Sequence, residues 1–318
     1  MIIVYLVIIL GFSLLLIKAA EVLTDGVRQL ADLTNLTKFN LTVLLMALIN
    51  ALPELVICVI AALNQQSLLA LGIILGSNIA NLSLVVGTAA VAGGGFSVAG
   101  EFLRMDIISI FLAGLTPFIL LLDGRLSPVD GLILLGIYAL FASREIYYPK
   151  EGDYHLRRFI ISRGRKKKIG HWLIRMGLGA ATLILSGEMI VRSGLSLAGF
   201  LGAAPFLIGL ITAIGTTLPE LSFEIKAVRR HEAAMVLGNL CGQLMANSTL
   251  ILGITALISP IKLLSGGLRD YGLGLGAFAL IFILFWIFTK TKKKLERWEG
   301  AMLVGAYLGF MILEWWRK

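Results

Sequence analysis

Long apolar stretches separated by short polar ones follow one another along the whole chain. Each stretch has about 18 residues or more, the length that an α-helix needs to cross the hydrocarbon core of a bilayer. No basic residues precede the first stretch and no small-residue cleavage site follows it, so we expect a retained helix and not a signal peptide. The pattern predicts about ten membrane helices, near residues 2–20, 38–62, 68–92, 104–122, 128–146, 172–196, 203–228, 233–259, 270–290 and 299–316.

Composition favours the same fold class. Of the 318 residues, 58% are hydrophobic and only 15% are charged, more apolar surface than a soluble domain of this length could bury. The sequence therefore predicts an all-α integral membrane protein that lies in a lipid bilayer. The histidines, His155, His171 and His231, fall in or beside predicted loops, which argues against an intramembrane zinc enzyme.

The net charge of +9 could indicate a nucleic-acid partner, but the distribution of the charges indicates a membrane topology instead. If the N-terminus lies outside, loops on the cytoplasmic side carry 21 of the 28 Lys and Arg residues, and the opposite side carries six. We therefore predict a multi-pass protein of the cell membrane with no nucleic-acid partner. Both termini would lie outside and the loop 147–171 in the cytoplasm, where its basic run could also contact anionic lipid.

The basic linker 147–171 divides the predicted helices into five and five. Because five is odd, the second half enters the membrane from the opposite side, and two halves of one fold then form an inverted repeat. An offset of 166 residues aligns Asn50–Leu55 (NALPEL) with Thr216–Leu221 (TTLPEL) without a gap. The same offset aligns "LGIILGSNIAN" with "LGNLCGQLMAN". We expect a first repeat at 1–146 and a second at 172–318, with the matching motifs at 38–92 and 203–259.

Two glutamates lie within these matched apolar segments. Burying an acidic side chain at the centre of a membrane helix costs on the order of 3 kcal/mol, so Glu54 and Glu220 must face the protein interior. No Lys or Arg lies at a similar depth, which leaves protons or bound cations as partners. Pro53 and Pro219 free backbone carbonyls nearby. Hydroxyl and amide oxygens, the ligands of hard cations, come from Asn50, Ser77, Asn81, Thr216, Thr217, Gln243 and Asn247.

The segments "LPEL…ALG…GSNIANLSLVVG" and "GTTLPEL…LGN…GQLMANSTLILG" resemble the two α-repeats of the cation/calcium antiporter superfamily, which includes the sodium/calcium exchangers. The resemblance covers nearly the whole chain. It implies that the second, third, seventh and eighth helices enclose the ions, while the first and sixth slide to alternate access. It also implies Glu54 and Glu220 as the main calcium ligands. Lining roles are implied for Ser77, Asn81, Thr216, Thr217, Gln243 and Asn247.

The chain departs from the family pattern at several ligand positions. The first motif usually reads G-T-S-L-P-E, and here Asn50 and Ala51 replace the two hydroxyl residues. Gln243 replaces a serine of the second G-S-N motif, and Asn247 stands where sodium/calcium members often have an aspartate. Fewer carboxylates weaken the case for several sodium ions and make a proton more plausible as the driving ion.

These observations predict secondary active antiport of Ca²⁺ against Na⁺ or H⁺, with no enzymatic activity and no cofactor. Exchange of another cation, such as Mg²⁺, Mn²⁺ or K⁺, stays open, as does a non-transporting sensor. Glu224 lies one turn after Glu220 and could be a proton relay or an access-path ligand. The interpretation favoured for it is a helix-end residue paired with Lys226 and Arg229.

Overall fold

The computed structural model describes residues 2–33, 51–98, 106–147, 169–202, 205–229, 233–263 and 268–316. Asn50 and most of the basic linker, residues 148–168, lie outside the described residues. The described helices are α1 (Ile2–Leu33), α3 (Leu52–Leu63), α4 (Ser67–Ala80), η1 (Asn81–Val85), α5 (Val86–Gly93), α6 (Asp106–Leu120), η3 (Leu121–Asp123), α7 (Pro128–Tyr147), α9 (Ile169–Leu201), α10 (Pro205–Arg229), α11 (Ala233–Met245), η4 (Ala246–Ile251), α12 (Leu252–Ile258), α13 (Leu268–Lys292) and α14 (Arg297–Trp316).

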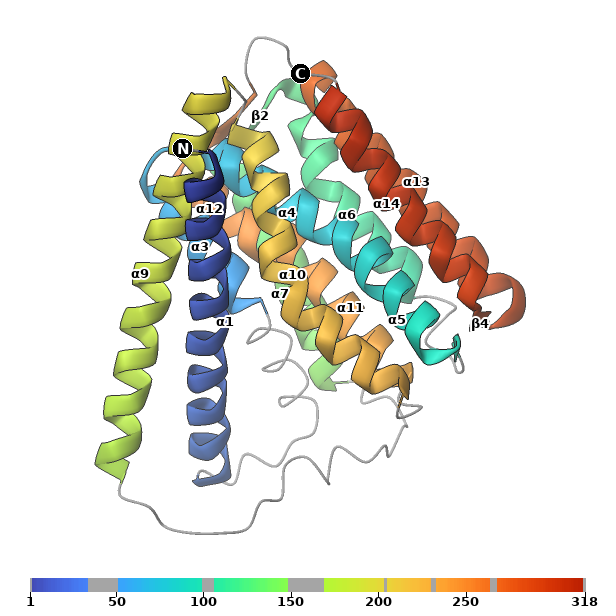
Figure 1. Ribbon diagram of the computed structural model, residues 1–318, viewed down its shortest axis with the longest axis horizontal. Coiled ribbons are helices and arrows are strands. Elements are labelled where there is room, and N and C mark those ends of the chain that lie inside the picture. The colour runs from blue at the N-terminus through green and yellow to red at the C-terminus, as the bar shows by residue number, and fades with distance from the viewer. Residues whose placement is uncertain are drawn as a thin grey trace.

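The helices form two inverted sets of five membrane spans, as the sequence predicts. Helices α4, η1 and α5 follow one another as the third span, and α11, η4 and α12 as the eighth. By length and composition, five of the described helices could cross a bilayer on their own, among them Ser67–Gly93 and Val236–Ile258. Helix α1 begins and α14 ends at the same end of the bundle (Figure 1). Both termini therefore lie on one side, as an even number of spans requires.

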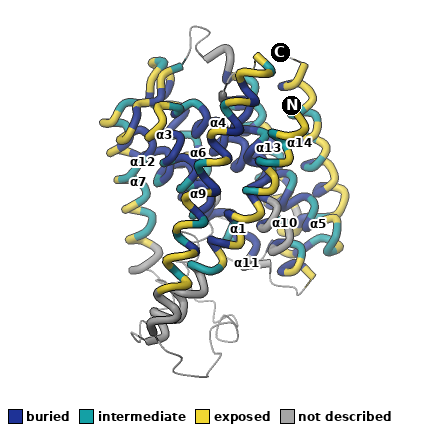
Figure 2. The backbone as a smooth tube through the Cα atoms, turned by 60° about the vertical axis from the view of Figure 1, so that its left-hand side comes forward, coloured by how far each residue is buried: buried dark blue, intermediate teal, exposed yellow. Residues whose placement is uncertain are grey.

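Burial separates an inner group of helices from an outer pair. The third span is almost wholly buried and the eighth is mostly buried (Figure 2). Helices α1 and α9 pack side by side at one edge of the bundle (Figure 1), and each has an exposed apolar face, with Val7 and Leu14 on α1 and Leu178 and Leu185 on α9. Exposed apolar faces of this kind suit contact with lipid. At 32 and 33 residues, these two helices are longer than the predicted spans 2–20 and 172–196.

Four two-residue strands, which the hydrophobic pattern did not predict, join the two halves. They are β1 (Phe96–Ser97), β2 (Arg125–Leu126), β3 (Ile261–Lys262) and β4 (Lys294–Leu295). Strand β1 pairs antiparallel with β4, and β2 pairs antiparallel with β3. Strands β1 and β3 follow the third and eighth spans, while β2 and β4 precede the fifth and tenth. Each small sheet therefore pairs the strand after the third span of one half with the strand before the fifth span of the other half, so the inverted repeat relates the two sheets.

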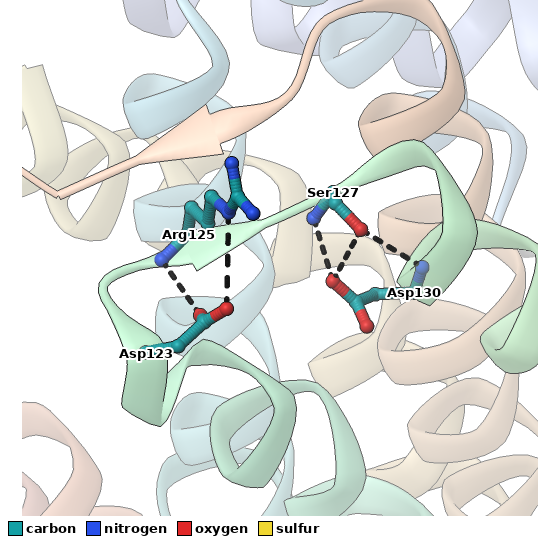
Figure 3. Close-up of polar contacts among 4 residues, drawn as sticks. All are labelled: Asp123, Arg125, Ser127 and Asp130. Atoms are coloured by element: carbon teal, nitrogen blue, oxygen red, sulfur yellow. Dashed lines mark hydrogen bonds and ion pairs between the residues drawn. The ribbon is translucent and has the colours of Figure 1, made fainter.

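The turn before α7 is held by its own side chains (Figure 3). Ser127 donates its backbone N–H and its hydroxyl to Oδ2 of Asp130, both at 2.7 Å, and the Asp130 N–H returns a bond to the hydroxyl at 3.3 Å. This reciprocal cap satisfies donors at the helix start. Arg125 contacts Asp123 across the preceding turn. At the start of α14, in the second half, the N–H of Glu296 bonds Glu299 in the same way at 2.8 Å.

Glycines allow helices of the two halves to touch through their backbones. A Cβ on Gly72 of α4 would overlap the carbonyl oxygen of Phe206 on α10, and one on Gly209 would lie 2.5 Å from the carbonyl oxygen of Leu69. Such distances exclude any side chain. The direct contact between α4 and α10 brings the polar centre of the first repeat against that of the second.

A second type of glycine contact occurs twice, each time between a helix of the first half and a helix of the second. A Cβ on Gly87 of α5 would lie 2.6 Å from the carbonyl oxygen of Gly300 on α14, and one on Gly131 of α7 would lie 2.8 Å from that of Gly253 on α12. Gly253 is the residue that the 166-residue offset pairs with Gly87. The two contacts are therefore related by the inverted repeat.

We expect Gly131→Ala to lower the free energy of unfolding by about 1–3 kcal/mol, because the added methyl group meets the backbone of α12. Gly136→Ala is the matched control on the same helix. A methyl group added at Gly136 would have no described atom within 4 Å, so this variant should be neutral or slightly stabilised. Thermal unfolding in detergent measures both variants. Equal effects of the two substitutions would contradict a backbone contact at Gly131.

Candidate cation site

The first carboxylate of the candidate site is at the start of α3. Helix α3 begins just after Ala51, and Pro53 stands in its first turn, where a missing N–H costs nothing. Glu54 is only 2% exposed. Its Oε1 accepts a long hydrogen bond, 3.5 Å, from the hydroxyl of Ser77 on α4, and Thr216 on α10 lies near this carboxylate. Helices from both halves therefore surround this carboxylate.

The second carboxylate lies in the middle of α10. Glu220 is 7% exposed, and its Oε1 accepts a 3.4 Å bond from Nε2 of Gln243 on α11. It lies close enough to Glu54 for the two charges to repel each other. Pro219 precedes it within the helix and offers no N–H, so the carbonyl of Gly215 receives no α-helical bond from that position. The fold thus brings together two carboxylates that are 166 residues apart in the sequence.

Both amides that the repeat pairs with these carboxylates stand at π-helical segments. In η1 the N–H of Val86 bonds the carbonyl of Asn81, and in η4 the N–H of Leu252 bonds that of Asn247. Each bond spans five residues, so each span contains one extra residue at the same point of the repeat. Segments of this kind are frequent at functional sites because they turn side chains out of the regular helical register. Hydrophobic periodicity did not reveal them.

Four buried oxygens near the two carboxylates have no hydrogen-bond partner among the described residues. They belong in matched pairs to the two repeats: Oε2 of Glu54 and of Glu220, and Oδ1 of Asn81 and of Asn247. A buried acceptor without a donor costs roughly 1–3 kcal/mol, and more when it is charged. The four atoms are therefore acceptors that a cation or protons could satisfy.

Other amide groups have defined partners. Asn81 donates Nδ2 to Oε1 of Gln243 at 2.9 Å, so the Gln243 amide lies between Asn81 and Glu220. Thr216 and Thr217 bond backbone carbonyls one turn earlier on α10, at 3.1 and 3.2 Å. Of the residues predicted from the sequence, Ser77 bonds Glu54, and Gln243 links Asn81 to Glu220. Asn247 bonds Asn78, Thr216 and Thr217 are buried on α10, and Asn50 lies outside the described residues.

Sequence reasoning missed Asn78. This side chain is fully buried, donates to Oγ of Ser248 at 2.8 Å, and accepts a 3.1 Å bond from Nδ2 of Asn247. It connects α4, just before the first π-helical segment, to the second π-helical segment. Its repeat counterpart is Leu244, so comparing the halves drew no attention to it. The available signal was an amide in an otherwise apolar run, directly after Ser77.

The chemistry of this arrangement suits a hard cation. Its donors are carboxylate, amide and hydroxyl oxygens, the ligands that Ca²⁺ and similar ions prefer. No group of three or more His, Cys, Asp or Glu residues that could hold a metal occurs in the described part of the chain. A site here would therefore combine two carboxylates with neutral oxygens.

We expect Asn78→Leu to lower the free energy of unfolding by about 1–3 kcal/mol, because it leaves Asn247 and Ser248 without their partner. Leu244→Met, at the repeat counterpart, keeps an apolar side chain of similar size and should stay near the wild type. Thermal unfolding in detergent compares the two. If they behave alike, the link between α4 and the second π-helical segment contributes nothing to stability.

Relatives of this chain include a sodium/calcium exchanger. The chain is 26% identical over 350 aligned residues to the sodium/calcium exchanger MaX1 of Methanosarcina acetivorans. The alignment covers 97% of this chain and 97% of MaX1. Two solved structures share the fold of this chain. The sodium-calcium exchanger NCX_Mj has a TM-score of 0.64 at 21% identity and covers 98% of this chain and 99% of its own. The H⁺/Ca²⁺ exchanger CAX has a TM-score of 0.75 at 18% identity, and the match covers 98% of this chain and 86% of CAX.

The family model described as sodium/calcium exchanger protein matches residues 4–146 and 171–316. These two ranges take in nearly the whole chain and leave out the basic linker. This ten-helix membrane protein belongs to the sodium/calcium exchanger family.

Proposed function

We propose that this protein is a secondary active antiporter that moves Ca²⁺ in exchange for H⁺ or Na⁺ by alternating access. The observation that carries the proposal is the set of four buried, unpartnered oxygens on Glu54, Glu220, Asn81 and Asn247. Two of them are carboxylate oxygens, so the ionised pair balances the charge of one divalent cation. In this proposal, Glu54 and Glu220 are the main ligands and the two asparagines complete the cage. Ser77, Thr216, Thr217 and Gln243 line it.

The same charge balance requires a counter-ion when Ca²⁺ leaves. Two carboxylates that repel each other in a low-dielectric interior need two monovalent charges, either protons or Na⁺. Protons bind carboxylate oxygens directly, whereas each Na⁺ needs several oxygens of its own. Gln243 already uses its amide to contact both Asn81 and Glu220, which reduces the space and the donors for further ions. We therefore favour H⁺. One structural relative is an H⁺/Ca²⁺ exchanger, and the other is a sodium-calcium exchanger.

The outer helices supply a mechanism for alternating access. Helices α1 and α9 pack against each other, and α9 also contacts α3 and α10, which carry the two carboxylates. A sliding motion of this pair would open the central site to one face and then to the other. Basic loop residues favour an orientation with both termini outside and the linker 147–171 in the cytoplasm. The linker then separates the two five-helix repeats at 1–146 and 172–318.

The first test is calcium flux into proteoliposomes that contain the purified protein. We expect a pH gradient to drive uptake of radioactive Ca²⁺, and a Na⁺ gradient of the same size to drive less, because the site has few oxygens for Na⁺. Excess Mg²⁺ or Mn²⁺ tests the selectivity. Flux under neither gradient, with correctly folded protein, would rule out calcium antiport. Uptake that Mg²⁺ or Mn²⁺ abolishes would indicate that another divalent cation is the substrate.

The second test removes one negative charge at a time. Glu54→Gln and Glu220→Gln keep the shape of the side chain, so we expect normal expression and a fall in transport of about 100-fold or more. Glu188→Gln is the control, because Glu188 lies on α9, is partly exposed and pairs with Arg192 at 2.6 Å. Its transport should match the wild type. Normal turnover by either central variant would mean that the cation binds elsewhere.

A further inference from the structure

A third buried carboxylate lies one helical turn beyond Glu220 on α10. Glu224 is only 2% exposed, and its Oε1 accepts a 2.9 Å hydrogen bond from Nδ2 of Asn239 on α11. Its Oε2 is buried and has no hydrogen-bond partner among the described residues. Lys226 and Arg229, the partners expected from the sequence, have exposed side chains. The expectation of a helix-end ion pair is wrong because Glu224 points into the bundle and these two basic residues point out.

This contact repeats the geometry of the central site. Gln243 on α11 donates an amide N–H to Glu220 on α10, and Asn239 donates one to Glu224. On each helix the two residues are four positions apart, which places them one turn apart on the same face. The two carboxylate–amide pairs therefore follow one another along the contact between α10 and α11. The Glu224–Asn239 pair is nearer the face of the membrane where α10 ends at Arg229 and α11 begins at Ala233.

The Glu224–Asn239 pair has no counterpart in the first half of the protein. The 166-residue offset pairs Glu224 with Cys58 and Asn239 with Ile73, and both of these side chains are fully buried. The Cys58 thiol lies 3.8 Å from the carbonyl oxygen of Ala70 and provides no charge. Glu54, Glu220, Asn81 and Asn247 follow the repeat, whereas Glu224 and Asn239 break it.

We propose that Glu224 and Asn239 form a second cation site, which takes Ca²⁺ on its way between the central site and the face where α10 ends. For the identity of the cargo, this inference rests on the proposed function. A carboxylate oxygen that is buried without a partner gains from a cation, and the negative charge raises the local cation concentration on one side only. The site makes the two faces of the exchanger unequal, although the central site is nearly symmetric.

Side-specific transport tests this asymmetry. In vesicles of defined orientation, we expect Glu224→Gln to raise the half-saturating Ca²⁺ concentration about tenfold at the face where α10 ends, and to leave the opposite face unchanged. Cys58→Ser, at the repeat counterpart, should alter neither face. Equal changes at both faces, or no change at either, would overturn the proposal.

Equilibrium binding of radioactive Ca²⁺ to the full-length protein in detergent provides a measurement that does not depend on transport. Glu54→Gln combined with Glu220→Gln should leave weak residual binding, and adding Glu224→Gln should abolish it. If the double variant binds nothing while the wild type binds and transports Ca²⁺, the second site is overturned and the proposed function stands. If the wild type transports no Ca²⁺ but the residual binding depends on Glu224, the proposed function fails and the second site stands.

Discussion

The burial of two carboxylates in the middle of a membrane is the constraint on which the rest of the structure depends. Glu54 and Glu220 lie close enough to repel each other, and each has one oxygen that no described donor satisfies. In a low-dielectric interior such a pair is costly unless positive charge balances it. A cation or two protons can do so, and neither is permanent. The cost of emptying the site therefore couples the release of one ion to the binding of another, which is what an exchanger requires.

The inverted repeat explains how one short motif makes a two-sided site. Glycines let α4 and α10 touch through their backbones, and further glycine contacts join α5 to α14 and α7 to α12. The π-helical segments at Asn81 and Asn247 occupy matching positions, and their extra residue turns each amide away from the regular helical register. Since both halves use the same features in opposite directions, their buried polar side chains converge at the centre of the bundle.

Departures from symmetry distinguish the two halves of this chain. Gln243 takes the position that Ser77 has in the first half, and its longer amide reaches both Asn81 and Glu220. Asn78 has an apolar residue, Leu244, as its repeat counterpart, and it links α4 to the second π-helical segment through Asn247 and Ser248. Glu224 replaces a buried cysteine of the other half. Each difference adds a polar group to the interior, where every such group must find a partner.

The sequence by itself determined the ten spans, the opposed orientation of the halves and the pairing of Glu54 with Glu220. Hydropathy reports which stretches can face lipid, and an ungapped 166-residue offset reports a shared local structure. Only the tertiary structure decided the partners of Asn78 and Glu224, the π-helical segments and the strands that join the halves. The physical reason is that a buried polar group is satisfied by neighbours across the bundle: the partners of Asn78 are 169 and 170 residues away in sequence. Hydrophobic periodicity reports only local structure and cannot reveal contacts between residues that are so far apart in the sequence.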